Sequence, residues 1–333
     1  MKSVLLLAPG KIEIQDVAAP VPVTGELLVS VKCALTCGTT LKAFQRGHPK
    51  IKMPGPFGHE FSGVVDLVGD GVENFSKGDR VVCLHTFPCK RCRFCIRGQT
   101  NLCVEFESRV IFGAYAEKIR IPKELAQTYC FKIPNPVSFL RAAFLQSVSC
   151  VVHGLNLLKL EGSETLCVLG TGSFAVLFAM LAKERGFFPV ILGRNFSKCE
   201  ALRERGFVCE SDFESSKKYW KNLSPQVVVE SVGSSVAWEQ AVQMVEPGGK
   251  ILWFGGLPGN ATVHLNHKKI HYEEITVQGA FHYTQKDVLE AKTLLFEKLD
   301  PTFLIADSLL LSQLEQAFQN MMDGKGQKYA IVP

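Results

Sequence analysis

Between residues 165 and 254, short apolar runs alternate with longer segments of helical pattern, and this alternation constrains the fold more than any other sequence feature. The predicted elements, strand and helix in turn, are Thr165–Leu169, Ser173–Arg185, Val190–Leu192, Ser197–Arg205, Val227–Glu230, Ala237–Val245 and Lys250–Phe254. Strands that alternate with helices of roughly 10–15 residues belong to βαβ units around a parallel sheet. The sequence therefore predicts an α/β protein with a doubly wound parallel sheet in this part of the chain.

The part of the chain before Pro134 has a different character, because proline and glycine repeatedly interrupt its apolar runs. This punctuation is typical of strands joined by turns. The strands predicted there are Val4–Leu7, Ile12–Ile14, Leu27–Val31, Phe61–Val68 and Arg80–Leu84. The remaining expected elements are one long helix, two shorter helices and a strand, at Ser138–Leu158, Asp287–Phe296, Ser312–Met322 and Ala330–Val332.

Length and composition exclude several classes of protein. The chain has 333 residues, 47% hydrophobic and 21% charged, which suits two domains with ordinary globular cores. Its net charge of +5 is mild and spread out, so nucleic-acid binding is not expected. No apolar run reaches the roughly 18 residues of a membrane span, and the first residues lack a signal-peptide pattern, so we expect a cytoplasmic protein.

Twelve cysteines in such a chain indicate metal binding rather than disulfides. Cys89, Cys92, Cys95 and Cys103 follow the spacing C-x2-C-x2-C-x7-C. Four thiolates spaced in this way can enclose one tetrahedral Zn²⁺, and a zinc with four cysteine ligands has no open position, so it is structural. An iron–sulfur cluster is the rival interpretation, but the ferredoxin spacings differ. Four unrelated buried thiols fit poorly with the basic, polar loop around them.

A glycine-rich turn joins the first strand of the alternating part to its first helix. Its sequence is Gly170-Thr171-Gly172-Ser173-Phe174-Ala175. The first glycine permits a tight turn, the second lets the backbone approach a pyrophosphate, and the alanine permits close helix–strand packing. The helix N-terminus adds amide donors, so this turn is expected to bind a dinucleotide. The expected contacts are Gly170, Gly172, Ser173 and Phe174.

The end of the second strand indicates which cofactor is bound. NAD-binding folds usually place an acidic residue there, about 20 residues on, to hold the ribose hydroxyls. This chain has Gly193-Arg194-Asn195 instead, with Lys198 in the following helix. Glycine leaves room for a 2′-phosphate and Arg194 can pair with it, so NADP(H) is expected over NAD(H). The competing interpretation is that Arg194 is a solvated loop cation.

A second set of metal-binding side chains occurs in the β-rich part. Cys37-Gly38-Thr39 and Gly58-His59-Glu60 each place such side chains beside glycine. A catalytic zinc uses three protein ligands and keeps an open position, and a cysteine, a histidine and a glutamate together suit one.

With these features, the sequence resembles the zinc-containing medium-chain alcohol and polyol dehydrogenases essentially from end to end. Further shared motifs are Gly58-His59-Glu60-x-x-Gly63, Gly113-Ala114-Tyr115-Ala116-Glu117, His153-Gly154, Glu230-x-x-Gly233 and Pro247-Gly248-Gly249. The segment His271–Gly279 resembles the polyol-type members most.

The resemblance implies a GroES-like β-rich catalytic domain at residues 1–145 with both zincs, a Rossmann cofactor domain at 146–285, and a return to the first domain at 286–333. It implies that Cys37 and His59 bind the catalytic zinc, with Glu60 as a ligand or exchange partner. Zinc would lower the pKa of the bound alcohol, Thr39 would pass its proton outward, and hydride would move to the nicotinamide. The resemblance also implies a homodimer or homotetramer.

Three positions depart from the family pattern. Gln146 stands where the family has a third ligand or a water-holding cysteine, aspartate or glutamate, and Cys150, one helical turn on, is the alternative. Thr40 stands where an aspartate usually orients the zinc histidine. Lys42 replaces the histidine that ends the proton relay, which leaves solvent or His48 as its end.

The remaining candidates carry no motif of their own. The resemblance places Phe281-His282-Tyr283 near the nicotinamide, where His282 either contacts substrate or packs within its loop. The other cysteines are interpreted as ordinary thiols: Cys33, Cys83, Cys130, Cys150, Cys167, Cys199 and Cys209.

Three functions are compatible with the sequence. We expect a zinc- and NADP(H)-dependent dehydrogenase of a secondary alcohol, a polyol or the matching ketone. The second is a zinc-independent reductase of the quinone-oxidoreductase kind, which Gln146 and Thr40 favour and Cys37 and His59 oppose. The third is a non-catalytic nucleotide-binding protein that retains the structural zinc.

Overall fold

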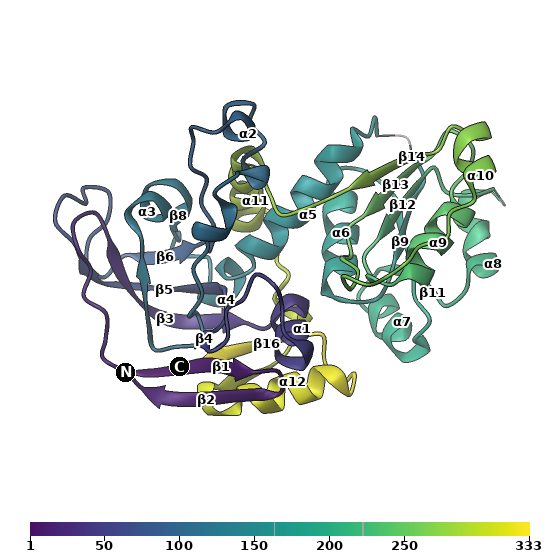
Figure 1. The fold of residues 1–333 in the computed structure, drawn as a ribbon. Coiled ribbons are helices and arrows are strands. Elements are labelled where there is room, and N and C mark those ends of the chain that lie inside the picture. Colours follow the sequence, from purple (N-terminus) through teal and green to yellow (C-terminus); the bar gives the residue numbers. More distant parts are fainter. Residues whose placement is uncertain (163, 222) are drawn as a thin grey trace. The chain divides into compact units, whose positions relative to one another are not determined.

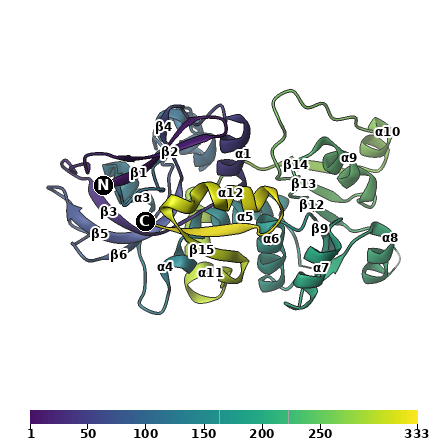
Figure 2. The same cartoon turned by 90° about the horizontal axis from the view of Figure 1, so that it is seen from below.

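The computed structural model describes residues 1–162, 164–221 and 223–333, and these divide into two compact units. Met1–Val148 and Thr284–Pro333 form the first unit, and Ser149–Tyr283 forms the second. In both ribbon views the yellow C-terminal elements lie among the purple and blue elements of the first unit (Figures 1 and 2). None of the described helices combines the length and the hydropathy needed to cross a membrane.

A six-stranded parallel sheet forms the centre of the second unit. Its strands, in spatial order, are β11 (Val208–Glu210), β10 (Pro189–Leu192), β9 (Leu166–Leu169), β12 (Val227–Glu230), β13 (Lys250–Trp253) and β14 (Thr276–Gly279). The strands β9, β10 and β12 are buried at every residue, as a parallel sheet covered on both faces requires. Strand order reverses between β9 and β12, and sheets of this kind bind ligands at the carboxyl ends of the strands beside such a reversal. The predicted α/β class with a doubly wound parallel sheet is confirmed.

Helices cover both faces of this sheet (Figure 1). They are α6 (Ser173–Glu184), α7 (Phe196–Arg203), α8 (Phe213–Ser216), η3 (Lys217–Trp220), α9 (Ser235–Met244) and α10 (His267–Tyr272). Helix α5 (Leu145–Leu158) begins in the first unit and continues into the second. The Oδ1 atom of Asn195 caps α7 by accepting from the Lys198 N–H at 3.0 Å, which fixes where the loop after β10 becomes helix.

The first unit is built on two sheets that are mostly antiparallel. Their strands are β1 (Lys2–Ala8), β2 (Lys11–Asp16), β3 (Leu27–Leu35), β4 (Gly55–Pro56), β5 (Glu60–Val68), β6 (Arg80–Cys83), β7 (Lys118–Ile121), β8 (Cys130–Lys132), β15 (Ile305–Leu310) and β16 (Lys328–Val332). The larger sheet has the order β15-β16-β3-β5-β6-β8, with β7 also on β3, and the smaller has the order β2-β1-β4. Ala330 of β16 pairs with Leu35 of β3, which brings the C-terminal segment beside β3.

Short helices fill the connections of the first unit. They are α1 (Gly38–Arg46), α2 (Arg93–Ile96), η1 (Thr100–Leu102), η2 (Phe106–Ser108), α3 (Lys123–Tyr129), α4 (Phe139–Ala142), α11 (Gln285–Glu297), η4 (Thr302–Leu304), η5 (Leu311–Gln313) and α12 (Leu314–Met322). The prediction of one helix over Ser138–Leu158 is wrong, because α4 and α5 are separate. The Phe144 N–H donates to the carbonyl of Arg141 at 3.2 Å, and this tighter i→i+3 bond ends α4.

Two cysteines without a motif are joined in the second unit. Cys199 on α7 and Cys209 on β11 form a disulfide, with their Cα atoms 5.2 Å apart. The interpretation of these two residues as ordinary thiols is therefore wrong. Packing of α7 on β11 brings them together, and no local spacing pattern encodes that contact. No disulfide joins the other cysteines interpreted in this way among the described residues: Cys33, Cys83, Cys130, Cys150 and Cys167.

Candidate functional site

The four cysteines of the C-x2-C-x2-C-x7-C run lie in one cluster. The sulfurs of Cys89, Cys92, Cys95 and Cys103 are all within 4.8 Å of one another. The backbone N–H of Cys92 donates to Cys89 Sγ, and that of Cys89 to Cys103 Sγ, each at 3.4 Å. Hydrogen bonds from backbone amides lower the pKa of Cys92 to about 6, which favours its thiolate. Four sulfurs gathered this closely suit a tetrahedral Zn²⁺.

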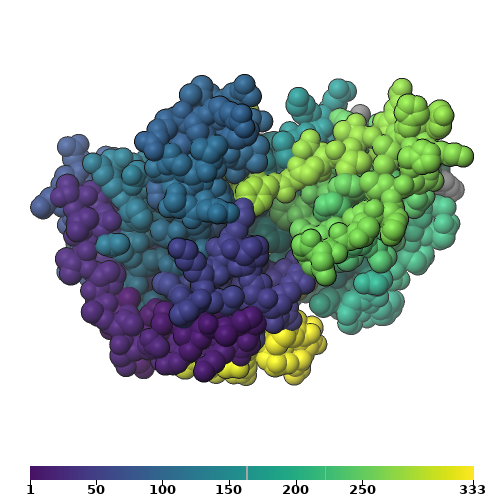
Figure 3. Space-filling view, in the orientation of Figure 1, coloured from purple at the N-terminus to yellow at the C-terminus, as the bar shows by residue number. Residues whose placement is uncertain are grey.

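Charged side chains hold the two ends of the cysteine loop together. Glu105 pairs with Arg91 at 2.8 Å and with Arg109 at 3.0 Å. The blue segment that contains this loop stands at the surface of the first unit (Figure 3). Since the loop has little regular structure of its own, a metal bound by its sulfurs is well placed to order it.

Cys37, His59 and Glu60 form a second group of metal-ligand atoms. The pairing of Leu35 with Glu60 across β3 and β5 brings the loop after β3 beside the start of β5. The ligand atoms of the three residues lie within 4.8 Å of one another, and Cys37 Sγ is 3.5 Å from His59 Nε2. All three side chains are buried. Burial lowers the pKa of His59 to about 4, so its imidazole is neutral, as a metal ligand must be.

Thr40 supports the cysteine of this group. Cys37 caps helix α1, and its sulfur accepts from the Thr40 N–H at 3.4 Å. The Thr40 hydroxyl donates to the Cys37 carbonyl at 3.0 Å and accepts from the Cys37 N–H at 3.1 Å. By contrast, the Nδ1 atom of His59 is buried and has no hydrogen-bond partner among the described residues. Thr40 therefore does not take over the histidine-orienting role of the aspartate that it replaces.

Lys328 and Ser147 hold the carboxylate of Glu60. Lys328 Nζ lies 2.6 Å from Glu60 Oε2, and both side chains are 1% exposed. Ser147 Oγ donates to Glu60 Oε1 at 3.1 Å and accepts from Lys328 Nζ at 3.4 Å. Burial raises the pKa of Glu60, and Lys328 opposes this rise. No sequence motif singles out Lys328; its one available signal is a lysine two residues before the last predicted strand.

A second histidine lies against the metal-ligand histidine. The His85 ring, just after β6, has its centroid 4.4 Å from that of His59, at an interplanar angle of 41°. Phe112 lies 6.2 Å from both rings. His85 could not be singled out from the sequence, because it stands outside any glycine-flanked motif.

The other predicted residues of the catalytic part are distributed over α1 and α5. Thr39 is exposed on the first turn of α1, and Lys42 is half-buried one turn later. Gln146 is buried on α5, directly before the Ser147 that contacts Glu60. Cys150 is buried one helical turn further along, in the second unit. A thiol, an imidazole and a carboxylate are a donor set that zinc accepts, so the group at Cys37 fits this metal.

The glycine turn lies at the carboxyl end of β9. Gly170 has φ +115°, a conformation that favours glycine, and Gly172 caps helix α6. A Cβ built on Gly172 would have no neighbour within 4 Å, so the backbone is open to a ligand there. Ser173 and Phe174 form the first turn of α6, with the buried Ala175 behind them. This geometry fits a dinucleotide pyrophosphate.

The loop after β10 lies directly beside that turn. A Cβ on Gly193 would overlap the Thr171 side chain, so glycine allows the loop to pack closely against the glycine turn. Arg194 and Asn195 are exposed, and Lys198 is half-buried on α7. The structure therefore leaves the Arg194 guanidinium accessible to a ribose substituent.

The chain is similar to known dehydrogenases over nearly its whole length. Residues 23–135 match the family model of the alcohol dehydrogenase GroES-like domain, and residues 170–297 match that of the zinc-binding dehydrogenase. A sorbitol dehydrogenase of Bombyx mori is 30% identical over 283 residues, which cover 81% of this chain and 80% of the relative. D-arabinitol dehydrogenase 1 of Uromyces fabae is 30% identical over 270 residues, with 77% and 75% covered.

The fold agrees with these matches. A zinc-binding dehydrogenase structure from Sinorhizobium meliloti 1021, bound to NADP, superposes with a TM-score of 0.88 at 25% identity and covers 100% of this chain and 99% of that one. The GroES-like part and the parallel-sheet part expected from the sequence are both matched. Together with the two groups of metal-ligand atoms, these similarities show that the chain belongs to the zinc-containing medium-chain dehydrogenase/reductase family.

Proposed function

We propose that the protein transfers a hydride between a secondary alcohol or polyol, or the matching ketone, and NADP(H). The observation that carries this proposal is the buried group of Cys37, His59 and Glu60, whose sulfur, nitrogen and oxygen atoms suit a catalytic zinc. The sorbitol and D-arabinitol dehydrogenases among its relatives support polyols as the substrate class. The NADP bound to the Sinorhizobium meliloti structure supports the choice of cofactor.

The first unit supplies the residues for the metal. Cys37, His59 and Glu60 would hold the catalytic zinc, and Gln146, next to a residue that touches Glu60, is the proposed neutral fourth ligand. When bound, such a zinc supplies a Lewis acid that makes an alcohol more acidic. The cluster at Cys89 would hold a structural zinc, because four sulfur ligands leave no position for a substrate.

Side chains of helix α1 and of the loop after it would carry the proton released from the alcohol to solvent. Thr39, two residues after Cys37, is exposed, so its hydroxyl can bond a substrate oxygen and exchange protons with water. Burial, and then the nearby charge of Lys50, lower the pKa of His48. A neutral imidazole can accept a proton, so His48 or solvent ends the relay in the place of the half-buried Lys42.

A substrate panel tests the proposed reaction. We expect NADP⁺ reduction with polyols that carry a secondary hydroxyl, and a kcat/KM at least about tenfold higher than for simple monohydric alcohols, because a site that hydrogen-bonds several hydroxyls discriminates against substrates lacking them. The measurement is NADPH absorbance, with ketoses tested in the reverse direction. Turnover of activated double bonds without turnover of alcohols or ketones would instead identify the zinc-independent reductase.

Replacing Arg194 tests the cofactor preference. We expect Arg194→Ala to lower the ratio of kcat/KM for NADP⁺ to that for NAD⁺ by about 10- to 100-fold, because a charge-assisted hydrogen bond contributes about 1.5–3 kcal/mol. Arg205→Ala is the matched control, since Arg205 is an exposed arginine just beyond the other end of α7. An unchanged ratio in Arg194→Ala would show that this residue is a solvated loop cation.

A further inference from the structure

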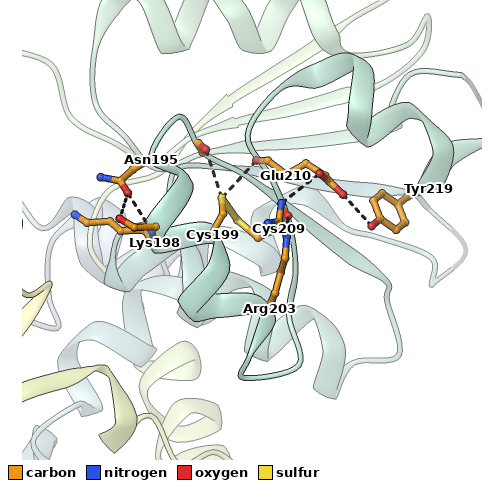
Figure 4. The surroundings of a disulfide bond; sticks show 9 residues. Asn195, Lys198, Cys199, Arg203, Cys209, Glu210 and Tyr219 are labelled. Atoms are coloured by element: carbon orange, nitrogen blue, oxygen red, sulfur yellow. Dashed lines mark hydrogen bonds and ion pairs between the residues drawn. A yellow bond between two sulfur atoms is a disulfide. The ribbon is translucent and has the colours of Figure 1, made fainter.

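The disulfide between Cys199 and Cys209 joins the helix that follows the Arg194 loop to an edge of the parallel sheet (Figure 4). Helix α7 begins immediately after Asn195, and β11 is the edge strand beside β10 in the sheet that the described residues form. The two cysteines are 0% and 1% exposed. Ten positions separate them, a stretch that contains the rest of α7 and the turn at Gly206. The bond therefore fixes α7 to β11.

The sulfur of Cys199 also lies against the backbone of the Arg194 loop. It is 3.4 Å from the carbonyl oxygen of Gly193 and 3.5 Å from that of Glu210. The Gly193 N–H donates to the same Glu210 carbonyl at 3.0 Å. One sulfur thus touches the residue before Arg194 and the residue after Cys209. In the reduced protein a Cys199 thiol would donate its S–H to one of these carbonyls, which the disulfide cannot do.

Hydrogen bonds connect the Arg194 loop to the first turn of α7. Asn195 Oδ1 accepts from the Lys198 N–H at 3.0 Å and from the Ser197 hydroxyl at 2.8 Å. At the other end of α7, Arg203 Nε donates to the Cys209 carbonyl at 2.7 Å. A change at the disulfide is therefore transmitted to the loop through a single capped helix.

We propose that Cys199 and Cys209 form a thiol–disulfide exchange site that sets the affinity for the phosphorylated ribose of NADP(H). This inference rests on the proposed function of Arg194. Because both sulfurs are buried, a low-molecular-weight thiol or disulfide can reach them only when α7 moves away from β11. On oxidation, the two thiols lose two protons and two electrons and form one S–S bond, while the S–S bond of the low-molecular-weight disulfide is cleaved to two thiols. The disulfide holds α7 and so preorganises the Arg194 loop, and reduction releases this constraint.

Glutathione buffers test the exchange site directly. The full-length protein is equilibrated in oxidised or in reduced glutathione, and the Cys199–Cys209 peptide is quantified by alkylation and mass spectrometry. Binding of NADPH and NADH is followed by the fluorescence of Trp220, Trp238 and Trp253, which all lie in the second unit. We expect reduction to raise the Kd for NADPH about 3- to 10-fold and to change that for NADH less than about twofold, because only NADPH carries the 2′-phosphate.

Two variants separate this site from the other cysteines. The double variant Cys199→Ser/Cys209→Ser should have the NADPH Kd of the reduced protein in both buffers. Cys167→Ser, which changes a free cysteine on β9, should keep the response. Absence of the disulfide in oxidised glutathione, equal Kd values in both buffers, or a redox response in the double variant would each overturn the proposal. Absence of any NADPH preference in either state would contradict the proposed cofactor, whereas a preference that does not depend on the disulfide contradicts the exchange site alone.

Discussion

Cys37→Ser is expected to lower kcat/KM by about 1,000-fold, the equivalent of about 4 kcal/mol of transition-state stabilisation. The serine hydroxyl is neutral at neutral pH and binds zinc weakly, so the group around Cys37 loses its one sulfur ligand. His59, Glu60 and the proposed neutral ligand Gln146 would remain, but without the thiolate they bind zinc weakly. The measurement is steady-state turnover of the best polyol from the panel with NADP⁺.

Metal analysis of the same variant identifies which group loses its ion. The two groups of ligand atoms predict two zincs in the wild-type chain and one in Cys37→Ser. Cys95→Ser should lose the other zinc, from the four-cysteine cluster. Cys33→Ser is the matched control, because burial raises the pKa of Cys33 to about 12 and keeps it a thiol outside both groups. Turnover at the wild-type rate in Cys37→Ser would contradict the catalytic assignment, and one zinc in the wild type would favour the zinc-independent reductase.

Lys328→Met is expected to destabilise the metal-free protein by about 3–5 kcal/mol, because without zinc the removal of Lys328 leaves the buried charge of Glu60 uncompensated. The Glu60–Lys328 pair is well suited to show this effect, since both side chains are 1% exposed and, among the described residues, Ser147 donates the further hydrogen bond to the carboxylate. Methionine keeps most of the lysine's volume, so the effect is mainly electrostatic. The free energy of unfolding is measured by urea denaturation of wild type and variant in the presence of a chelator, followed by circular dichroism.

A double-mutant cycle shows whether the loss of stability comes from the Glu60 carboxylate, which Lys328→Met leaves without its cation. Adding Glu60→Gln to Lys328→Met removes the remaining charge and should recover a large part of the lost stability. Ser147→Ala should cost only about 1 kcal/mol, the contribution of one ordinary hydrogen bond. A destabilisation below about 1 kcal/mol in Lys328→Met would mean that the carboxylate is protonated or reached by water.

The parallel sheet could be predicted because its inner strands are buried on both faces. A run such as Val227–Glu230 is apolar nearly throughout, and so it stands out from the segments around it. The edge strands β11 and β14 do not stand out in the sequence. Strand β14, for example, is exposed at both ends and so needs no continuous apolar run. The break between α4 and α5 was also missed, because the sequence stays apolar across it.

The two groups of metal-ligand residues differ in how far they can be predicted from the sequence. The four cysteines lie between positions 89 and 103, so their spacing alone points to a shared ion. Glu60 and Lys328 are 268 positions apart, and only the pairing of β16 with β3 brings them together. The bond between Cys199 and Cys209 spans ten positions, but it depends on how a helix packs on a strand and follows no recurring spacing.

The discontinuity of the first unit has a consequence for folding during synthesis. The second unit is one uninterrupted stretch, Ser149–Tyr283, and every strand of its sheet is available once that stretch has left the ribosome. The first unit cannot complete its larger sheet until β16 has been synthesised. This strand supplies a neighbouring strand for β3 and the lysine that pairs with Glu60. The cofactor-binding unit can therefore mature on the nascent chain first, while the unit that holds both metal groups is completed only after residue 328 has emerged.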